Sequence, residues 1–112
     1  MNPITRFYQF EIRGFHNLTQ ISEPSHGHNG FLRIGLLAPI PEEDEREFLL
    51  FVKTRVLSDF DKKDWSLALR GEPSGENLIR EIATRLQNWN PKLVKQVEFQ
   101  ETTKNNFLIQ FR

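Results

Sequence analysis

The segment HGHNGFLRIGLL, residues 26–37, predicts a strand that also carries candidate metal ligands. Alternate side chains of a strand point to the same face. The even positions therefore share one face, which carries the side chains of His26, His28, Leu32, Ile34 and Leu36. Two imidazoles on one face need one more nitrogen ligand to hold Zn²⁺ with an open coordination position. The alternative is a surface turn without a ligand, because short histidine motifs also match by chance.

A second strand is predicted upstream, over Ile4–His16. Its even positions place Tyr8, Phe10, Ile12 and His16 on one face, whereas Gln9, Glu11 and Arg13 share the other. The residues between His16 and His26 suffice for a loop that joins two antiparallel strands. All three histidines of the chain then lie on apolar faces at neighbouring ends of a hairpin, as a metal site requires. Three buried histidines bonded to the backbone are the alternative.

Length, composition and charge exclude several classes of protein. A chain of 112 residues makes one domain, residues 1–112, with room for a moderate core. The formal net charge is zero, which argues against a nucleic-acid partner, because neutralising phosphates requires a basic surface. The chain has no cysteine, which excludes disulfides, thiolate ligands and a cysteine nucleophile. We find no membrane span and no signal peptide, so we expect a soluble cytoplasmic protein.

Two helices are predicted in the middle of the chain. The first begins after Pro41 and runs over about residues 42–57, with a cluster of acids at the positive end of the helix dipole. A charged linker follows over residues 58–65. The second helix begins at Ser74, a good N-cap residue, and ends at Asn90.

The C-terminal part predicts two more strands, Leu93–Glu101 and residues 106–111. Glu101 continues the apolar face of the first of them, after Val97 and Phe99. A carboxylate at the end of an apolar stripe is costly unless it finds a partner, so it indicates a site. The alternative is a strand-end residue that the following turn directs to solvent. The element order is strand, strand, helix, helix, strand, strand.

Four segments, in this order along the chain, resemble the motifs of the 6-pyruvoyl-tetrahydropterin synthase family, which includes 6-carboxytetrahydropterin synthase. Residues 10–18 are similar to Phe-x-Phe-x-Ala-Ala-His-x-Leu, and residues 26–29 resemble the start of His-Gly-His-Asn-Tyr. Residues 73–77 resemble Pro-Thr-x-Glu-Asn, and residues 97–102 resemble a strand that ends in Glu-Thr. The resemblance implies an α+β tunnelling fold (T-fold), in which a four-stranded antiparallel sheet carries two helices on one face. It also implies a homo-oligomer, a trimer or hexamer, whose subunits join edge to edge into a barrel.

The resemblance implies a ligand for each motif. Carried over by position, three residues would bind Zn²⁺, namely His16, His26 and His28. Glu101 with Thr102 would hold the 2-amino-4-oxo edge of a pterin, and Ser74 would add to substrate binding. A carboxylate suits a guanidine-like edge because it accepts two hydrogen bonds from it. Zinc binds the oxygens of the substrate's side chain and acidifies the neighbouring C–H.

Departures from the family pattern concern the catalytic base. The family's catalytic cysteine is absent, and its Asp-His pair reads Asp61-Lys62 here. Gly30 replaces the tyrosine after His-Gly-His-Asn, and Gly14-Phe15 replaces the Ala-Ala pair before the first ligand. The usual base, a thiolate supported by an Asp-His pair, therefore cannot be assembled.

Glu23 is a candidate replacement base. It lies three residues before His26, where a variant class of the family carries Glu and cleaves the pterin side chain. A desolvated Glu can act as a base near neutral pH, and Glu23 with Asp61 would then move protons. The alternative for Glu23 is a solvated loop carboxylate, and Lys62 is expected to be an exposed lysine.

Three functions remain open from the sequence. The first is a zinc-dependent pterin enzyme, a carbon–oxygen or carbon–carbon lyase acting on the side chain of dihydroneopterin triphosphate or a related small molecule. The second is a catalytically inactive protein that binds a pterin- or purine-like ligand. The third is a purely structural oligomer.

Overall fold

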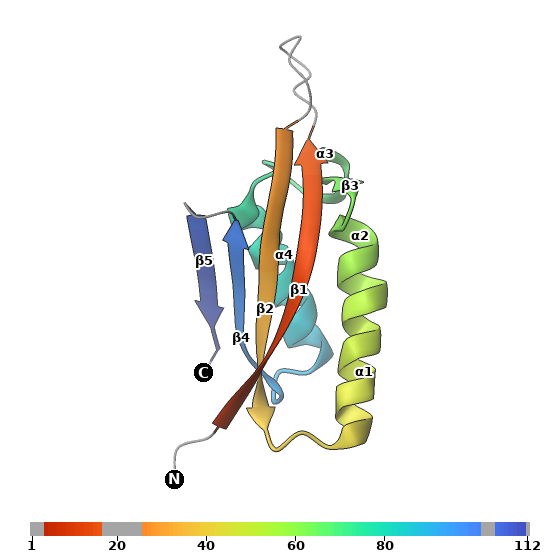
Figure 1. Cartoon of the computed structure of the whole chain (residues 1–112), viewed down its shortest axis with the longest axis vertical. Coiled ribbons are helices and arrows are strands. Elements are labelled where there is room, and N and C mark those ends of the chain that lie inside the picture. The colour runs from red at the N-terminus through yellow and green to blue at the C-terminus, as the bar shows by residue number, and fades with distance from the viewer. Residues whose placement is uncertain (1–3, 17–25, 102–104, 112) are drawn as a thin grey trace.

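The computed structural model describes residues 4–16, 26–101 and 105–111 and is shown in Figure 1. A five-stranded sheet carries helices on one face. The elements in chain order are β1 (Ile4–His16), β2 (His26–Ala38), α1 (Glu42–Val52), the π-helical turn η1 (Lys53–Leu57), α2 (Ser58–Phe60), β3 (Lys63–Asp64), α3 (Trp65–Ala68), α4 (Gly75–Trp89), β4 (Val94–Glu101) and β5 (Asn105–Gln110). No helix formed by the described residues is long and apolar enough to cross a membrane.

The strands lie in the order β3-β1-β2-β4-β5. The four long strands pair antiparallel, which confirms the predicted α+β fold with its four-stranded antiparallel sheet. The fifth strand, β3, was not predicted, and it pairs parallel to β1 over only two residues. It forms because Lys62 adopts a left-handed conformation, with φ 58°, and its backbone N–H donates to the carbonyl of Arg13. This contact turns the chain along the edge of β1.

Alternation along the central strand β2 positions the core. Leu32, Ile34 and Leu36 are fully buried, whereas Phe31 and Arg33 on the opposite face are exposed. This confirms the predicted inward face of β2. Fully burying one such aliphatic side chain contributes roughly 1.5–3 kcal/mol. In Figure 1, α4 crosses behind the strands and α1 runs beside β1.

The first helical segment is longer than predicted. Helix α1 continues through η1 and α2 to Phe60, inside the predicted linker. Val56 and Phe60 are both fully buried, so the apolar stripe continues at a spacing of four residues. Arg85 of α4 holds this end, because its Nη1 donates to the carbonyl of Arg55 at 2.7 Å and to Asp59 Oδ2 at 2.6 Å.

Tyr8 joins β1 to α1. Its hydroxyl donates to Glu45 Oε2 at 2.5 Å, and its ring centroid lies 5.0 Å from that of Phe48. Burial raises the pKa of Tyr8 above the ordinary 10.0, and the hydrogen bond to Glu45 raises it further. The folded state therefore favours the neutral phenol. This contribution to stability is fully present below pH 10.0 and is lost as the pH rises through the folded pKa.

We expect the phenolate absorbance to titrate at higher pH in the folded protein than in urea. Tyr8 is the only tyrosine, so the signal reports this group alone. The unfolding free energy of the parent protein should also fall relative to that of Tyr8→Phe as the pH rises above 10.0. Coincident folded and unfolded titrations would contradict the contact.

Candidate functional site

The register of the sheet brings the predicted site positions to one end of one face. His16 lies directly opposite His26, His28 opposite Gly14, and Glu101 opposite Gly30. Directly opposed residues share a face of the sheet, and so do residues two apart on one strand. The three histidine positions and Glu101 therefore occupy three neighbouring rows of the helix-facing side. Such rows are about 6.5–7 Å apart, and neighbouring strands are about 4.8 Å apart.

The structure describes the backbone of the three histidines and not their side chains. The zinc prediction therefore stays a prediction. Among the described side chains, no group of three or more His, Cys, Asp and Glu residues could hold a metal ion. Glu23 and Thr102, the predicted base and the partner of Glu101, lie outside the described residues.

Glu101 is half-buried, and its carboxylate lies at the N-terminus of α4. A methyl group built on Gly75, the first residue of α4, would overlap Glu101 Oε2. The same methyl group would lie 2.9 Å from the ring of Phe107 on β5. The segment that resembles Pro-Thr-x-Glu-Asn and the strand that ends in Glu-Thr therefore meet in space. A helix N-terminus carries a partial positive charge, which attracts a carboxylate.

Two side chains stabilise the start of α4. Ser74 is the N-cap, as predicted, and its Oγ accepts a hydrogen bond from the backbone N–H of Asn77 at 3.2 Å. The Nδ2 of Asn77 donates to the carbonyl of Glu72 at 2.8 Å. Ser74 thus has a structural role that satisfies a helix-terminal N–H, and its contribution to substrate binding stays a prediction.

Asp61 lies at the outer edge of β1, next to the point where β3 joins this edge. Its Oδ1 accepts a hydrogen bond from the backbone N–H of Arg13 at 3.0 Å, one residue before Gly14. With Glu11, Arg13 and Lys62 it lines a shallow hollow of about 240 Å³. Lys62 is exposed, as expected. The clamp between Asp61 and Arg13 was not predicted, because the two residues are far apart in the sequence.

Two buried rings occupy the space that the glycines of β1 and β2 leave open. A methyl group on Gly14 would overlap the indole of Trp65, and one on Gly30 would lie 2.6 Å from the ring of Phe99. Both rings are fully buried, and they meet edge to face with centroids 6.1 Å apart. Trp65 Nε1 also donates to the carbonyl of Phe60 at 2.9 Å. The two departures from the family pattern thus make room for an aromatic wall beside the site.

Sequence reasoning missed this wall. The available signal was a glycine near the histidine in each of two paired strands, at Gly14 and Gly30. A glycine inside a strand often marks a close approach by another group. Of the approaching groups, Trp65 comes from the predicted linker and Phe99 from β4, a strand that is distant from β2 in the sequence.

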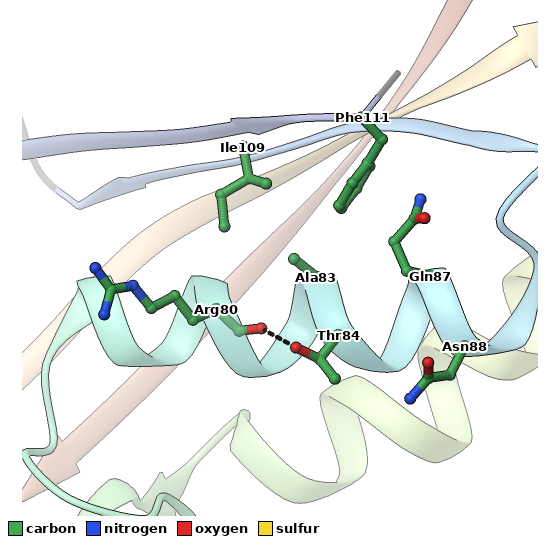
Figure 2. Close-up of a pocket in the computed structure, with 7 residues that line it drawn as sticks. All are labelled: Arg80, Ala83, Thr84, Gln87, Asn88, Ile109 and Phe111. Atoms are coloured by element: carbon green, nitrogen blue, oxygen red, sulfur yellow. Dashed lines mark hydrogen bonds between the residues drawn. The ribbon is translucent and has the colours of Figure 1, made fainter.

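A groove of about 450 Å³ lies between α4 and β5 (Figure 2). Ile109 and Phe111 point toward Ala83 of α4 in this view. The remaining lining residues are polar or charged and are Arg80, Thr84, Gln87 and Asn88. Among the predicted site residues whose side chains the structure describes, neither Asp61 nor Ser74 nor Glu101 lines this groove.

We expect Gly14→Ala to lower the free energy of unfolding by about 1–3 kcal/mol, because the added methyl group overlaps the buried indole. The smaller ring of Trp65→Phe should recover part of the loss in the double variant, which denaturant unfolding would measure. Gln9→Ala, at an exposed position of the same strand, is the control and should change stability by less than about 0.5 kcal/mol. Equal costs for Gly14→Ala with either residue at position 65 would contradict this packing.

Comparisons with known proteins support the fold. No model of a protein family matches the sequence, and no curated protein is significantly similar to it in sequence. Among solved structures, the chain is similar to the 6-pyruvoyl tetrahydropterin synthase of Caenorhabditis elegans, with a TM-score of 0.72 and 18% identity. The match covers 100% of this chain and 98% of that chain. The chain therefore has the fold of that pterin synthase, an α+β T-fold.

Proposed function

We propose that this protein is a zinc-dependent pterin enzyme, similar to 6-pyruvoyl- and 6-carboxytetrahydropterin synthases. Its substrate would be dihydroneopterin triphosphate or a related pterin, and the reaction would be the lysis of a bond in the side chain. The observation that carries this proposal is the register that places three histidine positions and Glu101 in neighbouring rows of one face. The likeness to the fold of a pterin synthase supports it.

The backbone positions of the histidines fit a metal centre. His16 and His26 are directly opposed, and His28 follows two residues along the same strand. Directly opposed Cβ atoms lie about 4.5–5.5 Å apart, a spacing from which two imidazoles can reach one ion. When bound, zinc would act as a Lewis acid on the oxygens of the substrate's side chain.

Glu101 would recognise the ring. A carboxylate accepts paired hydrogen bonds from an amino group and a neighbouring ring N–H, which is the pattern of a pterin edge. The Glu101 carboxylate lies beside Gly75, at the N-terminus of α4. Thr102 would assist Glu101, and the capped start of α4 at Ser74 would border the ligand.

Proton transfer would depend on Glu23 and Asp61, because the chain has no cysteine. Asp61 lies at the edge of β1, where it bonds to the backbone of Arg13. The next residue, Gly14, is directly opposite His28 on β2. One oxygen of Asp61 accepts from the backbone of Arg13, and its second oxygen can take part in proton exchange.

A catalytically inactive binding protein is the second candidate. The observation that favours it is the replacement of the family's histidine by Lys62, an exposed residue whose backbone N–H contacts Arg13. The ring-binding carboxylate would persist without turnover in such a protein. A purely structural oligomer, with neither metal nor ligand, is the third candidate.

We also propose assembly into a homo-oligomer, a trimer or hexamer, in the cytoplasm. Among the described strands, nothing pairs with the outer edge of β5 or with residues 4–12 on the outer side of β1. Open edges are templates for pairing with another chain, and two of them in one subunit allow a closed ring. A cysteine-free composition fits a reducing compartment.

Protein purified without a chelator should contain about one zinc ion per chain by elemental analysis. His28→Ala removes one of three ligands and should lower zinc affinity by more than about 100-fold, which exceeds the usual effect of losing a residue that hydrogen-bonds to a ligand. Arg33→Ala is the control, because Arg33 lies on the same strand with its side chain on the exposed face. Substoichiometric zinc that His28→Ala leaves unchanged would contradict the metal centre.

Turnover and binding separate the three candidates. We expect dihydroneopterin triphosphate to be converted, and Glu23→Gln or Asp61→Asn to stop conversion without weakening binding. Asn at position 61 can still accept from Arg13, so this variant tests proton transfer rather than folding. Glu101→Gln should weaken binding about 10–100-fold, the effect of losing hydrogen bonds to a charged group. Binding without conversion would indicate the inactive protein. If the protein neither binds nor converts the pterin, the structural oligomer is indicated.

A further inference from the structure

The first residue of α4, Gly75, has no side chain and lies buried against Glu101. Its φ is not in the left-handed region, whereas Gly71 has φ 80°. The backbone conformation at position 75 therefore does not require glycine. In a helix, glycine is intrinsically less favourable than alanine by up to about 1 kcal/mol. Space is the remaining reason for glycine, since an added methyl group would overlap Glu101 Oε2.

The helix cannot readily move away to make that space. Its start is fixed by the Ser74 cap on Asn77 and by the bond from Asn77 to Glu72. Leu78 and Ile79, in the next turn, are buried in the core. A side chain at position 75 would therefore displace the carboxylate of Glu101 rather than the helix.

Phe107 restricts the position of the Glu101 carboxylate from a second side. It pairs with Phe99 on β4, one row away from Glu101 on the helix-facing side. Its ring carbons would lie 2.9 and 3.4 Å from a methyl group on Gly75, so the ring and the carboxylate contact the same glycine. The row on the other side of Glu101 is that of His28.

We propose that Gly75 is a positioning residue that, with Phe107, sets where the Glu101 carboxylate lies and thereby which planar ligand edge it can accept. The inference rests on the proposed function in one respect, that Glu101 binds the ring of the ligand. Gly75 itself contributes only the absence of a side chain. A residue with a Cβ at position 75 moves the carboxylate off the helix N-terminus, toward the row of His28.

A double-mutant cycle on the ligand-free protein tests the contact. In denaturant unfolding, Gly75→Ala combines the gain from a better helix former with the cost of displacing the Glu101 carboxylate. The same change should be more favourable in a Glu101→Asp background, because the carboxylate of Asp is one methylene shorter and avoids the new methyl group. Additive effects would overturn the inference. Gly75→Ser serves in place of Gly75→Ala where the latter does not fold, with the same expected coupling.

Neopterin binding, followed by its fluorescence, tests the consequence for the ligand. Gly75→Ala should weaken binding about tenfold, a loss of about 1.4 kcal/mol. The Gly75→Ala/Glu101→Asp double variant should bind more tightly than Gly75→Ala under conditions in which the unfolding curves show both variants to be folded, so that recovered stability does not explain the rescue. Asn88→Ala, at an exposed position near the other end of α4, is the control and should bind like the parent.

The two measurements separate the two claims. Unchanged neopterin binding in Gly75→Ala, with weakened binding in Glu101→Gln, would overturn the positioning role. No neopterin binding by the parent protein would contradict the proposed function alone, and the unfolding cycle would still decide whether Gly75 positions Glu101.

Discussion

The pairing register between β1 and β2 fixes both the buried face of the sheet and the relative positions of the candidate site residues. It runs without a break from Ile4 opposite Ala38 to His16 opposite His26. A slip by one residue would move every side chain of one strand to the other face. Such a slip would expose the fully buried Ile12 or Leu32 and would separate the histidine positions. The hydrophobic effect that selects the register therefore also assembles the candidate site.

Three glycines shape this end of the sheet, because each leaves space for a group from another element. Gly14 and Gly30 admit the rings of Trp65 and Phe99, and Gly75 admits the carboxylate of Glu101. Each of these glycines is buried, so each close approach takes place where water does not fill the space. Because the wall of two fully buried rings is closely packed, it limits how far neighbouring groups can shift.

The segment after α1 links the helical layer to the candidate site. Phe60 is buried at the end of α2, and Asp61 and Lys62 then bond to the backbone of Arg13 on β1. Arg85 reinforces this path from α4, since it bonds to Arg55 and Asp59 and its guanidinium lies 4.8 Å from the centre of the Phe60 ring. A charged stretch of sequence thereby becomes an ordered edge of the sheet.

Local patterns in the sequence predict the long strands, the capped helix that begins after Ser74, and the rows of the sheet that contain Glu101 and the three histidine positions. These features follow from periodicity and capping, which depend on residues close together in the chain. Three other features depend on tertiary packing, namely the bond between Asp61 and Arg13, the formation of β3, and the close approach of groups from other elements to three glycines. Each of these contacts joins residues that are distant in sequence, and packing in three dimensions selects such partners because local pattern carries no information about them.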